Sequence, residues 1–348
     1  PVDFAAPFLD ALAVQPGSIR ALVGLARALQ RRGQVSAALM LAESALAQAP
    51  DDGHVLRLAG RLNGATRRWG RAELLMERAA QLEPDQYLPW QARAEMRLMG
   101  TGDPAQALAV LGEAPAGMIP DKLWAEFRAY AGDPATTIER AQALIEQHGV
   151  GGFGVQWPVF ALHAAHAFRQ VGEEEISVEI AEASRNIYLR SISDSLDAWI
   201  GHSGLAYAEW LAGRPEEALK HGCLALRFRR ERDALMPGMY EEFARIAALT
   251  GHLDLSRSLV EQLVRTDYGR TPLNVHALRL EPAWQPLREQ PGFESWLETF
   301  PPPARSSEIP DPTRRIDLKA IREQAYAVVE SIDGSAVEVL CSSLLDGD

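Results

Sequence analysis

Apolar residues along positions 17–50 recur at the spacing of one helix face, in two runs separated by polar residues and a glycine. The first run is Leu22, Leu25, Ala26 and Leu29, and the second is Ala38, Ala42 and Ala45. Gly33 interrupts the pattern between the two runs, and Pro50 follows the second run. Because glycine and proline both disfavour the interior of a helix, the pattern predicts two helices joined by a tight turn.

Prolines follow such runs at a constant interval in the first part of the chain. Pro16, Pro50 and Pro84 stand 34 residues apart. A period of about 20–50 residues is typical of stacked supersecondary units, and about 34 is the period of one helix–turn–helix repeat. The pattern continues with looser spacing and predicts about six or seven helical hairpins over residues 1–270.

Small residues occupy the positions where the two helices of each predicted hairpin would cross. Ala26 and Gly60 have that position in first helices, and Ala72 and Ala79 have it in second helices. Small side chains there allow the helices to approach to about 8–10 Å. Together with Trp90 in the third unit, these residues resemble the tetratricopeptide repeat (TPR) family. The resemblance implies an all-α, right-handed α-solenoid in which the first helix of each hairpin lines a concave face.

The sequence divides into a TPR-like helical repeat domain over residues 1–270 and three further segments. Residues 271–300 are similar to the closing segment of bacterial TPR proteins, with an extended apolar strip and then a short helix, and we expect them to cap the last hairpin. Residues 301–315 are rich in proline, serine and charge, which predicts a linker. Residues 316–332 have helical apolar spacing, and no Lys or Arg follows Glu323, so we predict an acidic amphipathic tail over residues 316–348.

The composition is that of a folded protein, with 47 % hydrophobic and 24 % charged residues. A net charge of −12 argues against nucleic acid as a partner, because neutralising phosphates requires a basic face. No apolar run reaches membrane-spanning length, so we expect no membrane insertion and a cytoplasmic location. The chain starts at Pro1, which leaves a signal peptide and a periplasmic location open. Cys223 and Cys341 are isolated, so we expect two unpaired thiols and neither a disulfide nor a zinc site.

The sequence contains no pattern that indicates catalysis, a cofactor or a metal. His163 and His166 lie at i and i+3, and His148 or His202 would have to complete a metal site with them. We interpret the pair as polar residues of a first helix and expect no catalytic residue, no cofactor and no metal. The alternative is an enzyme with a cryptic histidine-based site, or an accessory or substrate-delivery subunit of an enzyme complex.

Basic side chains fall on the predicted concave face of the first two hairpins. They are Arg20, Arg27 and Arg31 in unit one and His54, Arg57 and Arg61 in unit two. Guanidinium groups bind carboxylates in a bidentate geometry, so this face suits an acidic ligand. The pattern resembles TPR domains that clamp a terminal carboxylate, although Val23 and Gly24 depart from their lysine and asparagine positions. The alternative is that these arginines are ordinary solvated surface.

Later units predict an apolar and aromatic lining of the same face. His166, Tyr207 and Trp210 are its candidate partner-binding residues, with packing between hairpins as the alternative role for the two aromatic side chains. We therefore expect a non-catalytic scaffold that binds a protein or peptide, one with an acidic segment, in the concave groove. The acidic tail is expected to dock in the basic groove of its own molecule or of a neighbour, and the second case gives a homo-oligomer.

Overall fold

The computed structural model describes residues 5–156, 158–193, 198–230, 237–268, 272–301, 317, 319, 321, 323 and 332–345. Helices make up its regular structure, and none of these residues lies in a strand, which confirms the all-α prediction. No helix in the described ranges has both the length and the apolar character needed to cross a bilayer.

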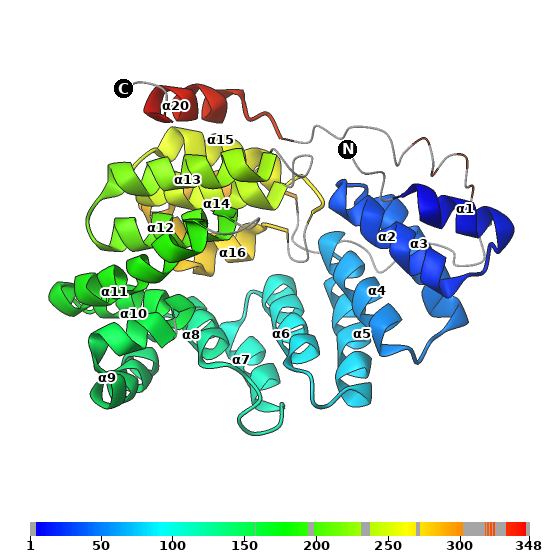
Figure 1. Ribbon diagram of the computed structural model, residues 1–348, viewed down its shortest axis with the longest axis horizontal. Helices are drawn as coiled ribbons and strands as arrows, with labels where there is room; N and C mark the ends of the chain where they lie inside the picture. Colours follow the sequence, from blue (N-terminus) through cyan, green and yellow to red (C-terminus); the bar gives the residue numbers. More distant parts are fainter. Residues whose placement is uncertain are drawn as a thin grey trace.

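After α1 (Ala6–Val14), the helices follow one another as packed pairs. The described pairs are α2 (Ile19–Arg31) with α3 (Val35–Gln48), α4 (Gly53–Ala65) with α5 (Trp69–Leu82), α6 (Tyr87–Thr101) with α7 (Pro104–Gly112), α8 (Asp121–Tyr130) with α9 (Ala135–Gln156), α10 (Pro158–Gln170) with α11 (Glu174–Ser193), α12 (Ala198–Leu211) with α13 (Pro215–Arg230), and α14 (Pro237–Leu249) with α15 (Leu253–Leu263). Each pair also packs on the next, as α3 does on α4 and α13 on α14. The pairs follow a curved path in Figure 1.

Alternate helices along this path also contact one another. Helix α4 packs on α6, α8 on α10, α10 on α12, and α12 on α14. The first helices α8, α10, α12 and α14 therefore form a common wall, which is the geometry that places side chains from distant parts of the sequence in one site.

The turn inside each pair contains one residue in the left-handed backbone region. In six of the seven described turns it is glycine: Gly33, Gly102, Gly132, Gly172, Gly213 and Gly251. In the α4–α5 turn it is Arg67, with φ of 59°. A residue with a Cβ pays about 1–2 kcal/mol for this conformation. The Arg67 backbone conformation is therefore unfavourable, and contacts of the side chain must offset its free-energy cost.

The Arg67 side chain joins the α4–α5 turn to the segment that follows α15. Its guanidinium lies 2.7 Å from Asp267 Oδ1 and donates to the carbonyl oxygens of Val264 (2.9 Å) and Thr266 (3.0 Å). Arg67 is only 2 % exposed. Parts of the chain 200 residues apart thus meet at one buried charge.

Residues 272–301 form short helices, namely α16 (Val275–Leu280), the 3₁₀ helix η1 (Pro282–Trp284), α17 (Gln285–Arg288) and α18 (Phe293–Leu297). The expected extended strip is therefore wrong at 275–280, where Asn274 caps a helix by accepting from the backbone N–H groups of His276 and Ala277. Trp284 is fully buried and packs with η1 on α14. The Asn274 side chain also donates to the Met99 carbonyl at 3.0 Å, so this segment contacts α6.

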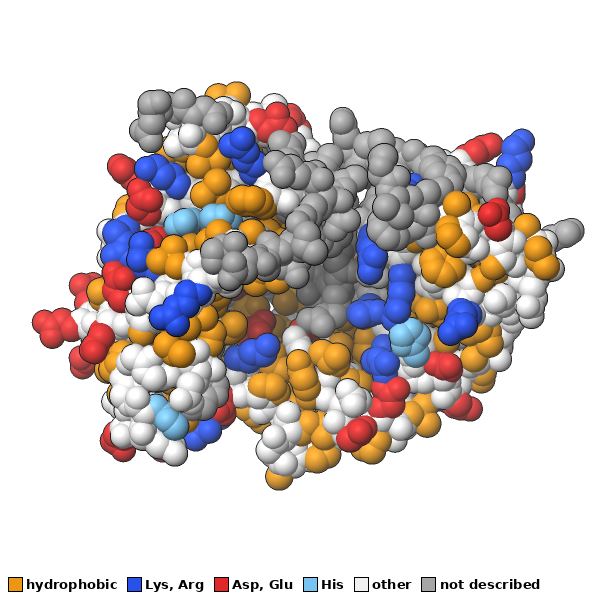
Figure 2. Space-filling model, viewed as in Figure 1, with side chains coloured by type: hydrophobic (Ala, Val, Ile, Leu, Met, Phe, Trp, Pro, Cys, Tyr) orange, Lys and Arg blue, Asp and Glu red, His pale blue; other side chains and the backbone are white. Residues whose placement is uncertain are grey.

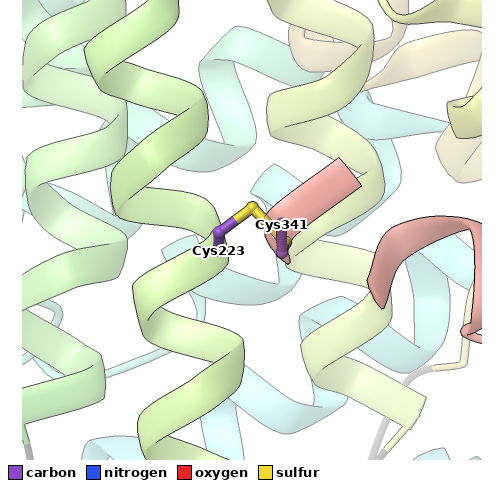
Figure 3. The surroundings of a disulfide bond; sticks show 2 residues. All are labelled: Cys223 and Cys341. Atoms are coloured by element: carbon purple, nitrogen blue, oxygen red, sulfur yellow. A yellow bond between two sulfur atoms is a disulfide. The ribbon is translucent and has the colours of Figure 1, made fainter. Parts of the chain in front are cut away.

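The end of the chain returns to α13 through a disulfide. Cys341 in α20 (Ser335–Leu345) is bonded to Cys223 in α13, as Figure 3 shows, so the expectation of two unpaired thiols is wrong. The two cysteines are 118 residues apart, and the turn before α20 places Gly334 against Tyr240 of α14. Of the predicted linker 301–315, all but Pro301 lies outside the described residues.

Candidate functional site

Helices α2 and α4 carry the six basic residues that the sequence assigned to the concave face. Arg20 and Arg31 are exposed on α2 and Arg27 is partly buried there, while His54 is exposed at the start of α4. Arg57 and Arg61, one and two turns further along α4, are partly buried. In Figure 2 the right-hand half, where Figure 1 places α2–α5, shows Lys and Arg side chains gathered around a histidine.

The electrostatics place Arg27, Arg57 and Arg61 near His54, and Arg20 and Arg31 lie on α2 at helical spacing from Arg27. We call these six residues the arginine strip (Arg20, Arg27, Arg31, His54, Arg57 and Arg61). The pKa of His54 is lowered, first by partial burial and then by the positive charges of Arg27 and Arg57. Arg57 forms an ion pair with Glu83. In contrast, no carboxylate of the described chain forms an ion pair with Arg20, Arg27 or Arg31.

A second candidate site is a cavity of about 470 Å³ along α8, α10, α12 and α14. His166, Tyr207 and Trp210, the aromatic set expected from the sequence, all line it, together with Leu162, His163 and Ser203. Residues 281–283 close one side of the cavity. No residue of α2 or α4 reaches it, so the structure separates the nine expected partner-binding residues into two sites.

The cavity contains acidic residues that the sequence pattern did not indicate. Glu126, Asp133, Glu242 and Glu281 line it, beside the indole of Trp199. Glu281 was missed because the segment that carries it was expected to be extended, and the other acidic residues because helical spacing alone does not show which turn faces a neighbouring pair. Their placement adds four carboxyl groups to a site that is otherwise mainly apolar and aromatic.

Arg245 of α14, which is not among the residues that line the cavity, forms ion pairs with two of these acidic residues, Glu242 and Glu281. It forms ion pairs with Glu281 (2.6 Å), Glu242 (3.0 Å) and Glu241, and its guanidinium stacks over Trp284 at 5.5 Å. Burial alone would lower the pKa of Arg245, but the carboxylates of Glu241 and Glu281 raise it well above its ordinary value. Arg245 is therefore a permanent cation inside a group of three carboxylates.

The histidines of the cavity are neutral near pH 7. Burial lowers the pKa of His163 and of His166 to about 4 in each case, and nearby positive charges act in the same direction. The His166 ring faces the Trp210 ring at 5.5 Å, and no described residue hydrogen-bonds to its buried Nε2 atom. His202 instead pairs with His221, with 3.0 Å between their Nδ1 atoms. Within the described chain, no three His, Cys, Asp or Glu side chains are placed to share a metal ion.

We expect the stability of the protein to fall as the pH is lowered from about 6.5 to about 4, in part because of His166. In this window the unfolded chain binds a proton that the folded His166 does not bind, whereas above about pH 6.5 both states are neutral and the contribution is constant. Urea unfolding at pH 7.5 and 5.0 should show that His166→Gln reduces the loss of stability by about 1–2 kcal/mol. His252→Gln, at an exposed position, is the matched control. Equal losses in wild type and His166→Gln would contradict the assignment.

The described part of the tail contacts two distant places. Ile321 is 3 % exposed and belongs to the apolar cluster formed by α1–α5, while α20 packs on α13 in the other half of the molecule (Figure 1). For α20, the expected docking in the basic groove of its own molecule is therefore wrong, because the disulfide holds this helix on α13, while docking in the groove of a neighbouring molecule stays a prediction. The sequence matches no protein-family model, and no curated protein is a significant match to it.

Proposed function

We propose that the chain is a right-handed, TPR-like α-solenoid that acts as a non-catalytic scaffold and binds an acidic segment of another protein along the arginine strip. The observation that carries this proposal is the group of three α2 arginines, Arg20, Arg27 and Arg31, for which the described chain provides no ion-pair partner.

The lack of ion-pair partners for these three arginines contrasts with the pairing of other arginines in the described chain. Many described arginines are paired inside the protein, for example Arg71 with Glu43, Arg97 with Glu73, Arg185 with Glu209, and Arg245 with Glu281. A chain of net charge −12 has carboxylates in excess, yet none of those on the described residues forms an ion pair with the α2 arginines. Unpaired guanidinium groups in one strip attract an acidic ligand and bind its carboxylates in bidentate geometry.

The tail is a candidate competitor for the same region. Ile321 packs in the α1–α5 cluster, and the stretch 317–323 around it contains Asp317 and Glu323 as well as Lys319 and Arg322, so it has no net charge. Within the proposal, the tail acts in cis through the apolar contact of Ile321, and an external acidic segment displaces it. Ending the chain at Phe300 should then strengthen binding of that segment, and unchanged affinity would remove the tail from the proposal.

Charge reversal tests the strip directly. The double variant Arg27→Glu/Arg31→Glu should bind acidic 12-residue peptides on an array at least about tenfold more weakly than wild type, because each change replaces attraction by repulsion. Basic peptides of the same length should not lose signal. Arg190→Glu/Arg227→Glu, at exposed positions of α11 and α13, changes the net charge by the same amount and is the control. If this control loses as much signal as the double variant, binding is unspecific and the strip is not the site.

A further inference from the structure

The cavity along α8, α10, α12 and α14 combines negative charge with aromatic surfaces. We propose that it binds an organic cation with an ammonium or guanidinium head and an apolar body, either a free amine or a Lys or Arg side chain of a bound polypeptide. The inference is independent of the arginine strip, which lies on other helices and selects the opposite charge.

Charge complementarity is the first argument. Glu126, Asp133, Glu242 and Glu281 line the cavity, and no Lys or Arg is among the described lining residues. His163 and His166 are neutral near pH 7, because burial holds the pKa of each at about 4, so they do not repel a cation. The lining therefore favours a positive ligand over a neutral or negative one.

The ion pairs of Arg245 do not neutralise the negative charge of the acidic residues that line the cavity. One guanidinium, that of Arg245, serves the three carboxylates of Glu241, Glu242 and Glu281. Burial raises the pKa of Glu242, which means that its charged form has lost hydration that Arg245 only partly replaces. A cation in the cavity would supply the missing stabilisation at Glu242 and Glu281.

The aromatic residues supply the second half of the site. Tyr130, Tyr207, Trp199 and Trp210 line the cavity. The guanidinium of Arg169 already lies over the Trp210 ring at 5.1 Å, so the rings of Tyr130, Tyr207 and Trp199 are the ones that attract the organic cation and cover its apolar part. His166 Nε2, which has no hydrogen-bond partner among the described residues, offers a polar contact beside Trp210. A volume of about 470 Å³ lies within the range of about 300–1,000 Å³ that is common for small-ligand sites.

Calorimetric titration of the full chain at pH 7.5 tests the proposal with two pairs of probes. 2-Phenylethylammonium is compared with 2-phenylethanol, and acetyl-Ala-Arg-Ala amide is compared with the same peptide containing citrulline. Each cation should bind at least about tenfold more tightly than its neutral partner. Tighter binding of the free amine assigns the site to small amines, and tighter binding of the arginine peptide assigns it to polypeptide side chains.

Variants connect the binding to the cavity. Asp133→Asn, Glu242→Gln and Trp199→Leu should each weaken binding of the cation at least about fivefold, while Glu216→Gln, at an exposed position of α13, should not. Asp133→Asn removes a carboxylate that does not pair with Arg245, so it tests the site even if Glu242→Gln disturbs the ion pairs of Arg245. Circular dichroism confirms that each variant is folded. Arg27→Glu should bind the cation as wild type does, so failure of the arginine strip leaves this result intact. The proposal is overturned if the neutral probes bind equally, if no cation binds, or if both carboxyl variants bind like wild type.

Discussion

Replacing Arg67 by methionine is expected to lower the free energy of unfolding by about 3–5 kcal/mol. The substitution keeps an apolar stem of similar length but removes the partner of Asp267 and the donor to the Val264 and Thr266 carbonyl groups. Breaking a buried ion pair on one side leaves the other charge without compensation, and the carbonyl groups cannot recover water at a position that is 2 % exposed. Urea unfolding followed by circular dichroism measures the change.

Two controls separate the buried contacts from the backbone effect. Arg67→Gly loses the same hydrogen bonds but relieves the positive φ, so it should be less destabilising than Arg67→Ala by about 1 kcal/mol or more. Arg78→Met removes an exposed ion pair with Asp51 and should cost less than about 1 kcal/mol. A loss for Arg67→Met as small as that for Arg78→Met would show that the junction with the α15 segment is not a stabilising contact.

The helical pairs could be predicted from the sequence because their signals are local. Apolar spacing, with breaks such as Gly33 and Pro50, predicts two helices per unit, and Val35–Gln48 is indeed a helix that begins two residues after the glycine. The same logic explains why residues 275–280 were misjudged. Six residues are too few to show a helical period, and the helix there depends on one capping side chain, Asn274.

Arg67 could not be assigned from periodicity, because its partners lie 200 residues away. A signal was nevertheless present in the sequence. Arg67 stands 34 residues after Gly33, at the turn position that glycine occupies in the other described pairs. A non-glycine residue at a left-handed position indicates that its side chain makes contacts that offset the strain. The sequence could thus have shown that Arg67 matters, although not what it contacts.

The sequence could predict some residues that line the cavity, but it could not predict that acidic and aromatic side chains meet there. His166, Tyr207 and Trp210 fall on first helices at the spacing of one face, and the structure places all three along one cavity. Glu281 comes from a segment more than 70 residues after Trp210, and Asp133 from a turn, so only the folded chain shows that they line the same cavity as the aromatic rings.

The Cys223–Cys341 bond was missed because isolated cysteines carry no pairing information and because the tail was expected to dock elsewhere. Alkylation of the unreduced protein followed by intact mass measurement should add no label to either cysteine.

Cys341→Ser is expected to lower the free energy of unfolding by about 2–4 kcal/mol, because the bond closes a long loop in the unfolded chain. Loss of the disulfide should destabilise helix α20 more than it destabilises the rest of the protein. Helix α20 has 11 residues, and a cavity of about 370 Å³ remains between it and α13, so packing alone holds it weakly. Hydrogen exchange should show α20 amides losing their protection while those of α13 keep it.

The double variant Cys223→Ser/Cys341→Ser provides the decisive comparison. Both single variants and the double variant remove the same bond, so their losses of stability should be equal and not additive. Reduction of the wild type should reproduce the exchange pattern of Cys341→Ser. If Cys223→Ser, at a position that is 1 % exposed, is much more damaging than Cys341→Ser, the loss comes from packing in the α13 core and not from the bond to the tail. Protection of α20 that survives in the double variant would mean that contacts around Val337, and not the disulfide, fix the end of the chain.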